Sequence, residues 1–351
     1  MSDISRRDFF KLAGVTAAVA VAGNFSITEA EKNKTIKLTR QAPVIGSKLV
    51  ANNVSGSIAK VYFTKNIDAE HLIKLYNLIN DEIYGKVAIK IHTGEPHGPN
   101  ILPRDMVQQF QAQIPNSTIV ETNTMYGGAR FTTESHRETL KTNGWTFCAV
   151  DILDEYGDAN LPVNGGKWFK TLEVGKNLLN YDSLVVLTHF KGHAMGGFGG
   201  SLKNIAIGCA SGHHGKRTVH GYLNPNGPMP FGMKELQEMP VKEEFMERMA
   251  DSGKAICDYF GKHIVFLNIM QRMSVDCDCA GTSAKEPTMA DIGICASTDI
   301  LAIDQACCDF VYSASDSQDL RERIESRHGL HQLTAMANHK MGNFQYELIQ
   351  I

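Results

Sequence analysis

One stretch, residues 183–216, constrains the fold of this chain more than any other. Its residues 184–187 form an apolar run rich in β-branched side chains, which predicts a buried strand. Four glycines between positions 196 and 200 then remove the Cβ atoms that would keep a ligand away from the backbone. Ser201 is a predicted N-cap for a helix over residues 202–207, so loop and helix N–H groups would form an anion site. The loop lacks the spacing of a dinucleotide or Walker motif, so it does not by itself indicate a nucleotide.

The same strand–loop–helix pattern recurs along the chain. Predicted strands at residues 87–92, 117–121 and 184–187 each run into a polar, glycine-bearing loop before a helix. This repetition predicts an α/β fold with a mainly parallel sheet flanked by helices, in one large domain or in two lobes around a cleft. Further strands are expected at residues 58–63, 263–269, 291–296 and 344–351.

The three loops would meet at one edge of such a sheet. We expect His92 or Glu95 to act as a general base there, and Lys191 to bind an anionic group. A lone histidine is more often structural, but two histidines and a lysine within five residues at a strand end favour a functional site. The other predicted ligand-binding residues are Asn123, Tyr126, Arg130, Gly197, Gly199, Gly200, Lys203 and Asn204.

A second group of reactive side chains lies in the sequence Asp276-Cys277-Asp278-Cys279. Alternate residues of an extended segment point to the same face, so the two cysteines can point one way and the two aspartates the other. With His189 and His193, the thiolates would suit a zinc or iron ion. A redox-active thiol pair and a tight turn with buried thiols are the alternatives.

The amino terminus carries a targeting signal. Residues 5–11, SRRDFFK, fit the twin-arginine export pattern, and the apolar stretch at residues 12–23 is too short to span a membrane. We therefore expect a signal peptide at residues 1–30, a linker at 31–56 and the α/β domain at 57–351. The chain would use the Tat translocase and reach the periplasm or the medium, without a stable membrane anchor.

Composition excludes some partners and cofactors. The net charge of −3, without a basic run interleaved with aromatic residues, argues against nucleic acid. The eight cysteines show no Cys-x-x-Cys pair and no spacing typical of a small disulfide scaffold.

Several segments resemble the family catalogued as domain of unknown function 362. They are VAIKIHTGE, TNTMYGG, VLTHFKGHAMGGFGGSLKNIAIGCAS, and DCDCAG followed by DIGICASTDILAIDQA, from Lys86 to about Asp309. The resemblance implies an inserted ferredoxin module in many members, after the GCAS segment. Here residues 221–244 contain no cysteine, so a ferredoxin-type iron–sulfur cluster is not expected. A further cysteine of the family's pattern is replaced by Ala280.

Three hypotheses of function follow. The first is an exported metal-dependent or redox enzyme that acts on a small anionic substrate. The second is a non-catalytic metal- or cofactor-binding accessory protein for an exported iron–sulfur or redox system, which would need the metal ligands but not Lys191 or Glu95. The third is a structural protein whose glycine loop serves only packing.

Overall fold

A computed structural model of the protein describes residues 58–222, 230, 235 and 239–351. The predicted signal peptide and the linker at residues 31–56 lie outside this part of the chain.

An eight-stranded mixed sheet organises the described residues, in the strand order β12-β1-β11-β10-β7-β2-β3-β4. The five strands from β10 to β4 are mutually parallel, whereas β11 is antiparallel to both of its neighbours. The strands are β1 (Ala59–Thr64), β2 (Val87–Lys90), β3 (Ser117–Glu121), β4 (Val150–Ile152), β7 (Ser183–His189), β10 (Ile264–Met270), β11 (Gly293–Ser297) and β12 (Tyr346–Gln350).

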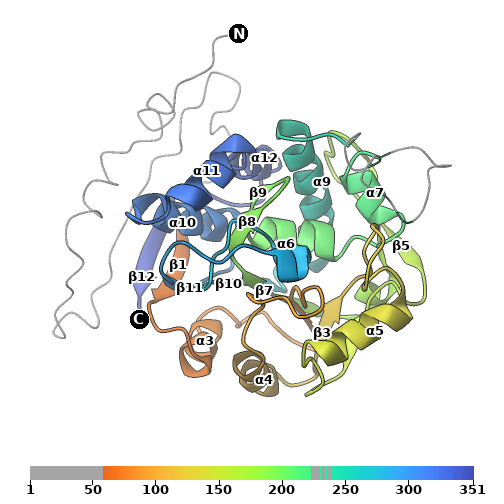
Figure 1. Ribbon diagram of the computed structural model, residues 1–351, viewed down its shortest axis with the longest axis horizontal. Coiled ribbons are helices and arrows are strands. Elements are labelled where there is room, and N and C mark those ends of the chain that lie inside the picture. The colour runs from red at the N-terminus through yellow and green to blue at the C-terminus, as the bar shows by residue number, and fades with distance from the viewer. Residues whose placement is uncertain (1–57, 223–229, 231–234, 236–238) are drawn as a thin grey trace, which may run out of the picture.

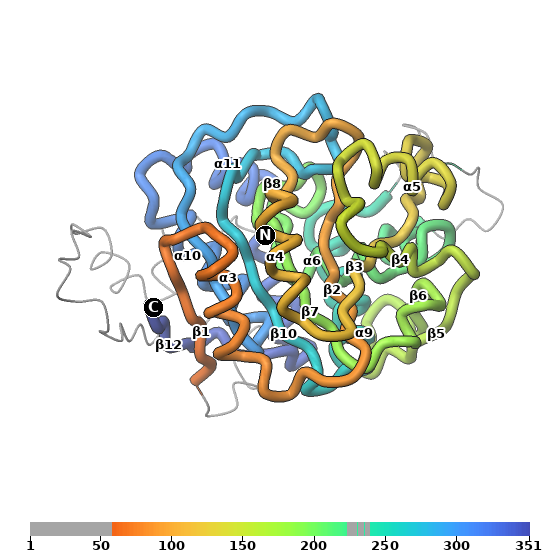
Figure 2. The backbone as a smooth tube through the Cα atoms, turned by 90° about the horizontal axis from the view of Figure 1, so that it is seen from below, coloured from red at the N-terminus to blue at the C-terminus, as the bar shows by residue number. Residues whose placement is uncertain are grey.

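Helices cover both faces of this sheet (Figures 1 and 2). One layer contains α3 (Ala69–Tyr76), α4 (Arg104–Ala112) and α5 (Thr133–Thr142), whose apolar side chains join one buried cluster. The other layer packs into a second cluster. It contains α6 (Ser201–Gly208), α7 (Gly215–Val219), α9 (Glu243–Phe260), α10 (Ile300–Ser313), α11 (Gln318–Ser326) and α12 (His331–Asn338).

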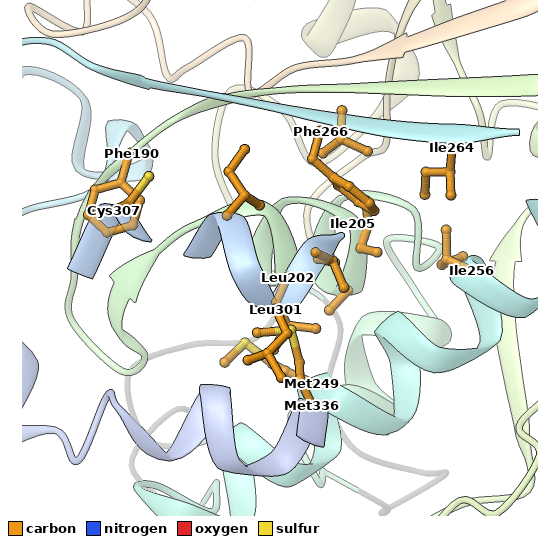
Figure 3. Close-up of a cluster of buried hydrophobic side chains, with 14 of the residues drawn as sticks. Phe190, Leu202, Ile205, Met249, Ile256, Ile264, Phe266, Leu301, Cys307 and Met336 are labelled. Carbon is orange, nitrogen blue, oxygen red and sulfur yellow. The ribbon is translucent and has the colours of Figure 1, made fainter. Parts of the chain in front are cut away.

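The second cluster fixes α6 against the sheet. Leu202 and Ile205 of α6 have no exposed surface and lie among Phe266 of β10, Met249 of α9 and Leu301 of α10 (Figure 3). Burying each aliphatic side chain of this size contributes about 1.5–3 kcal/mol. The helix that follows the glycine loop is therefore held by packing from three other elements.

Short elements complete the described fold. A two-stranded antiparallel hairpin pairs β5 (Asp158–Pro162) with β6 (Thr171–Gly175). The glycine loop forms a second hairpin, β8 (Lys191–His193) with β9 (Gly197–Gly199). Two 3₁₀ helices are η3 (Lys176–Asn180) and η4 (Asp278–Ser283).

The α/β fold with a mostly parallel sheet is confirmed. Because β2, β3 and β7 are adjacent and parallel, their carboxyl ends and the loops that follow them share one edge of the sheet. This edge carries the candidate site.

Candidate functional site

A cavity of about 630 Å³ opens at the carboxyl ends of β2, β3 and β7. Its walls come from these strand ends, from the β8–β9 hairpin, from α6, and from the starts of α7 and η4. The polar and charged residues that line it are Lys90, His92, Glu121, Thr122, Thr124, Tyr126, Arg130, Thr188, His189, Lys191, His193, Lys203, Asn204, Lys216, His220, Cys279 and Arg327.

Three potential metal ligands meet beside this cavity, and two of them, His193 and Cys279, line it. A ring nitrogen of His193 and the sulfurs of Cys277 and Cys279 all lie within 4.8 Å of one another. Zinc binds sulfur at about 2.3 Å and imidazole nitrogen at about 2.0–2.1 Å, so tetrahedral ligands lie roughly 3.3–3.8 Å apart. Small side-chain movements would therefore allow all three donors to coordinate one ion. The fourth coordination position of that ion would remain open.

The hydrogen bonds of His193 determine which of its ring nitrogens carries a proton. Its Nδ1 accepts from the backbone N–H of Gly196 at 2.8 Å, so in the neutral ring the proton is on Nε2. Burial, together with the nearby charge of Lys203, holds the pKa of His193 well below its ordinary value, so the ring is neutral. Metal binding through Nε2 would move the proton to Nδ1 and break the bond from Gly196.

The pKa values of the two cysteines move in opposite directions. The hydrogen bond from Cys279 lowers the pKa of Cys277 well below its ordinary value, with help from the ammonium groups of Lys203 and Lys191. The same hydrogen bond and burial raise the pKa of Cys279. Lys203 Nζ lies 3.7 Å from the Cys277 sulfur. Cys277 is therefore the more acidic thiol of the pair, and the ammonium group of Lys203 lies beside it.

His189 is not part of this donor group. Its Nδ1 lies 2.9 Å from Oδ2 of Asp278, and its Nε2 lies 2.8 Å from the carbonyl oxygen of Gln271. A carbonyl oxygen only accepts, so Nε2 carries a proton and has no lone pair for a metal. The structure thus brings together three of the four predicted ligands and gives His189 other partners.

Lys191 forms the other ion pair of Asp278, with 3.0 Å between Nζ and Oδ2. Burial alone would lower the pKa of Lys191, but the carboxylate of Asp278 and the charge of Cys277 raise it above its ordinary value. Lys191 is therefore an ammonium group at the cavity wall. Since it is already protonated, it cannot act as a base near neutral pH.

A buried ion-pair network lines another part of the cavity. Glu121 of β3 lies 2.9 Å from Lys90 Nζ, 3.3 Å from His92 Nδ1 and 3.7 Å from Arg130. Burial would raise the pKa of Glu121, but Lys90 and His92 hold it well below the ordinary value. Glu95 accepts hydrogen bonds of 2.9 Å from both Arg130 and the Tyr126 hydroxyl. In this network the positive and negative charges balance.

Lys216 at the start of α7 differs from the other buried cations. Its Nζ donates to three neutral oxygens: the Thr122 hydroxyl, the Asn123 carbonyl at 2.7 Å and the Ala210 carbonyl at 2.9 Å. Within the described residues, no carboxylate forms an ion pair with it. Burial lowers the pKa of Lys216 to about 8.

The predicted ligand-binding residues divide into two sets. Gly199, Gly200, Lys203, Asn204, Tyr126 and Arg130 line the cavity, as do the predicted catalytic residues His92 and Lys191. The side chain of Asn123 instead bonds His136 and Thr133 of α5. Gly197 and Glu95 are also absent from the cavity wall, and Gly197 packs against the backbone of Gly329.

The amino end of α6 is not the open anion site that we expected. Gly200, rather than Ser201, is the N-cap, and no side chain of the loop caps the helix. The carboxylate of Asp304 from α10 accepts from the N–H of Ser201 at 2.7 Å and of Leu202 at 3.0 Å. Because a protein carboxylate already occupies these donors, the helix terminus is not open to an anion.

The sequence analysis gave no role to Lys90, Glu121 or Lys216. Lys90 and Glu121 are charged residues at the ends of apolar strands, and this is the signal that could have singled them out. A charge in such a position needs a buried partner, and here each supplies the other. The catalytic and binding roles of the cavity residues remain predictions.

No helix among the described residues is long and apolar enough to cross a lipid bilayer. A comparison with curated protein sequences finds no match. Two solved structures resemble the fold weakly, each at 12% identity, and likenesses of this size carry no statement about activity. One is the lactate racemase apoprotein from Thermoanaerobacterium thermosaccharolyticum, with a TM-score of 0.40 over 91% of this chain and 88% of that chain. The other is a protein from Thermotoga maritima, with a TM-score of 0.41 over 69% of this chain and 59% of that chain.

The family comparisons are more specific. Residues 87–309, which include both cysteines of the donor group and the whole glycine loop, match the family described as Domain of unknown function (DUF362). Residues 3–23 match the twin-arginine translocation pathway signal sequence. The protein thus carries a signal for export by the Tat pathway, and its chain belongs to the DUF362 family.

Proposed function

We propose that this exported protein is an enzyme that holds a divalent zinc or iron ion at His193, Cys277 and Cys279 and acts on a small anionic substrate. The observation that supports this most is that the three donors lie together and that two of them, His193 and Cys279, line a cavity that also contains several buried cations. Three protein ligands and one open position are typical of catalytic zinc sites, and structural sites use four ligands.

A bound ion would supply a Lewis acid, which polarises an oxygen of the substrate. The residues of the chain would do the rest. Lys191 and Lys203 would bind the anionic group, since both line the cavity and their side-chain methylene carbons pack beside Gly199. Nζ of Lys203 lies 3.7 Å from the sulfur of Cys277. His92, oriented by Glu121, would take up or deliver a proton in the cavity.

The metal content of the protein tests this proposal. The protein is purified after Tat export, and the metal per chain is measured for the wild type and for Cys277→Ser. We expect close to one equivalent of zinc or iron in the wild type and a large loss in the variant. Less than a tenth of an equivalent after reconstitution with either metal would refute the proposal.

A second candidate is a metal-free redox site formed by the two thiols. The bond from Gly196 to His193 favours this alternative, because it occupies the lone pair of Nδ1 and leaves the proton on Nε2, so neither ring nitrogen is free for a metal. The ion pair between Lys203 and Cys277 also favours it, because it stabilises a reactive thiolate. Such a site predicts no bound metal and a reversible disulfide between Cys277 and Cys279, which mass analysis before and after reduction detects.

The non-catalytic accessory protein uses the same donors. It predicts that replacing Lys191 or Glu95 by alanine leaves metal binding and biological function unchanged. A loss of function with full metal content in either variant would exclude it.

A further inference from the structure

His220 carries a free hydrogen-bond acceptor at the wall of the cavity. The residue is 7% exposed and lines the cavity, and its ring packs on Phe245 of α9. Its Nδ1 lies 2.7 Å from the carbonyl oxygen of Lys216. A carbonyl oxygen only accepts, so Nδ1 carries the proton and Nε2 carries the lone pair of the neutral ring. Among the described residues, no group donates a hydrogen bond to this nitrogen.

The other histidines of the cavity are engaged differently. Both ring nitrogens of His189 have protein partners. His193 accepts at Nδ1 and carries its proton on Nε2. His92 lies beside Glu121, and the proposed function gives it the proton transfer. Because a buried acceptor without a partner is unfavourable, Nε2 of His220 indicates that a ligand or a water molecule donates to it.

The charges near His220 decide which kind of donor fits. Burial lowers the pKa of His220 to about 4, and the charges of Lys203 and Lys216 act in the same direction. The ring is therefore neutral at neutral pH. An ammonium group of a ligand would meet the same two positive charges and be repelled. A hydroxyl group is neutral and donates, so it is the donor that fits Nε2.

Two cations of the cavity keep N–H groups without a partner in the described part of the chain. Nζ of Lys203 has one contact, 3.7 Å from the sulfur of Cys277, so two of its N–H groups are free whatever the state of that thiol. Arg327 is exposed and donates from Nε alone, to the carbonyl oxygen of Ala194 at 2.6 Å. Of these two charges, that of Lys203 acts on His220, so Lys203 is the nearer cation.

We infer that His220 is a specificity-determining residue and that the cavity selects a small hydroxycarboxylate. The carboxylate binds Lys203, and the hydroxyl donates to Nε2 of His220. This inference rests on the anion-binding part of the proposed function and does not require the metal.

Titration calorimetry of the full exported protein tests this inference, with the metal content measured, and again after a chelator has removed any metal. The probes are two pairs of acids that differ by one hydroxyl: glycolate with acetate, and 3-hydroxypropionate with propionate. In the metal-free sample no ion can bind the hydroxyl. There we expect at least one hydroxy acid to bind about fivefold more tightly than its partner. Equal affinities within both pairs would show that water satisfies Nε2 and would overturn the inference.

Variants of His220 assign the preference to this ring. His220→Phe should abolish the preference and leave the affinity for acetate and propionate within about threefold. His220→Gln retains an acceptor, so it should keep a reduced preference, and it replaces His220→Phe if that variant does not fold. His263→Phe is the matched control, because His263 also donates from Nδ1 to a backbone carbonyl, at 2.7 Å, but does not line the cavity. A folded His220 variant with the full wild-type preference would overturn the inference.

The position of the carboxylate is tested separately. Lys203→Met should weaken the binding of all four acids about tenfold, because hydrogen bonds to charged groups are the stronger ones. Arg327→Met should leave these affinities within about threefold. A larger loss in Arg327→Met than in Lys203→Met would overturn the placement of the carboxylate at Lys203.

The outcomes separate this inference from the proposed function. A protein that takes up no metal but prefers a hydroxy acid through His220 refutes the metal centre and supports the inference. A protein that takes up one metal ion but binds both acids of each pair equally refutes the inference and leaves the metal centre standing.

Discussion

Nδ1 of His189 lies 2.9 Å from Oδ2 of Asp278, and both side chains are almost fully buried. Asp278 is the residue between the two cysteines, so this contact fixes the backbone that places Cys277 and Cys279 at the cavity. Burial would raise the pKa of Asp278, but His189 and Lys191 hold it well below the ordinary value. His189 therefore supports the donor group without belonging to it.

Replacing Asp278 by asparagine should destabilise the protein. The change leaves the buried ammonium of Lys191 without a counter-charge, and breaking a buried ion pair typically costs about 3–5 kcal/mol. Asp276→Asn is the matched control, because Asp276 pairs with Arg323 at a partly exposed position, where such pairs contribute about 0–1 kcal/mol. Denaturant titration measures the free energy of unfolding of both variants. An equal decrease in this free energy for Asp278→Asn and Asp276→Asn would contradict this account.

Gly200→Ala should also destabilise the protein, through the cap of α6. A Cβ at position 200 would lie 2.4 Å from Oδ1 of Asp304, so the carboxylate would have to leave the N–H groups of Ser201 and Leu202. Losing such buried hydrogen bonds costs about 1–3 kcal/mol. A Cβ at Gly128 meets no atom within 4 Å, so Gly128→Ala should change the free energy of unfolding by less than about 0.5 kcal/mol. A Gly200→Ala variant as stable as Gly128→Ala would show that Asp304 does not cap α6.

The affinity of the cavity for a small carboxylate such as acetate should depend on pH through Lys216. Burial, followed by the charges of Lys90 and Arg130, lowers its pKa to about 8, although Asp154 and Glu121 oppose the shift. Below pH 8 Lys216 is charged and the affinity should be constant. Above pH 8 the free protein loses this charge, so the acetate affinity should fall as the pH rises.

Calorimetry between pH 6.5 and 9.5 measures this dependence in the zinc-loaded protein. The Lys216→Met variant should show a weaker affinity that does not fall above pH 8. An identical fall in wild type and variant would assign the titration to another group.

The metal ligands should differ in how much affinity they provide. We expect Cys277→Ser or Cys279→Ser to weaken zinc binding at least 100-fold, because each removes a thiolate ligand. His193→Gln should weaken it only about tenfold, because metal binding by His193 must first break the bond from Gly196. Competition with a chelator measures the three affinities.

Cys148→Ser controls for the loss of a thiol in general, since Cys148 is a free thiol that does not line the cavity. A larger loss of zinc affinity for His193→Gln than for the Cys277→Ser and Cys279→Ser variants would contradict this ranking.

The repeated order of apolar run, polar glycine-bearing loop and helix was enough to predict the α/β fold and the edge of the sheet that carries the candidate site. Three apolar runs, each followed by a polar loop and a helix, predicted parallel strands whose carboxyl ends share one edge of the sheet. In the structure His92, Lys191 and His193 line one cavity at this edge. The two cysteines were expected on one side of an extended segment. They do lie together, but Cys277 caps the 3₁₀ helix η4, which contains Cys279.

Long-range partners account for what the sequence analysis could not predict. Asp278 is 89 residues from His189, and Asp304 is 103 residues from Ser201. Nothing in the local sequence of His189 or Ser201 shows that a distant carboxylate occupies its hydrogen-bonding groups. The partners of Lys90 and Lys216 likewise follow from the order of the strands, which a single sequence does not fix.

X-ray absorption spectroscopy of the zinc-loaded protein tests the metal centre most directly, because it reports the atoms bound to the ion. This account predicts two sulfur neighbours at about 2.3 Å, together with nitrogen or oxygen neighbours at about 2.0–2.1 Å. A shell of nitrogen and oxygen alone, with both cysteines reduced, would show that the thiolates do not hold the metal and would contradict the account.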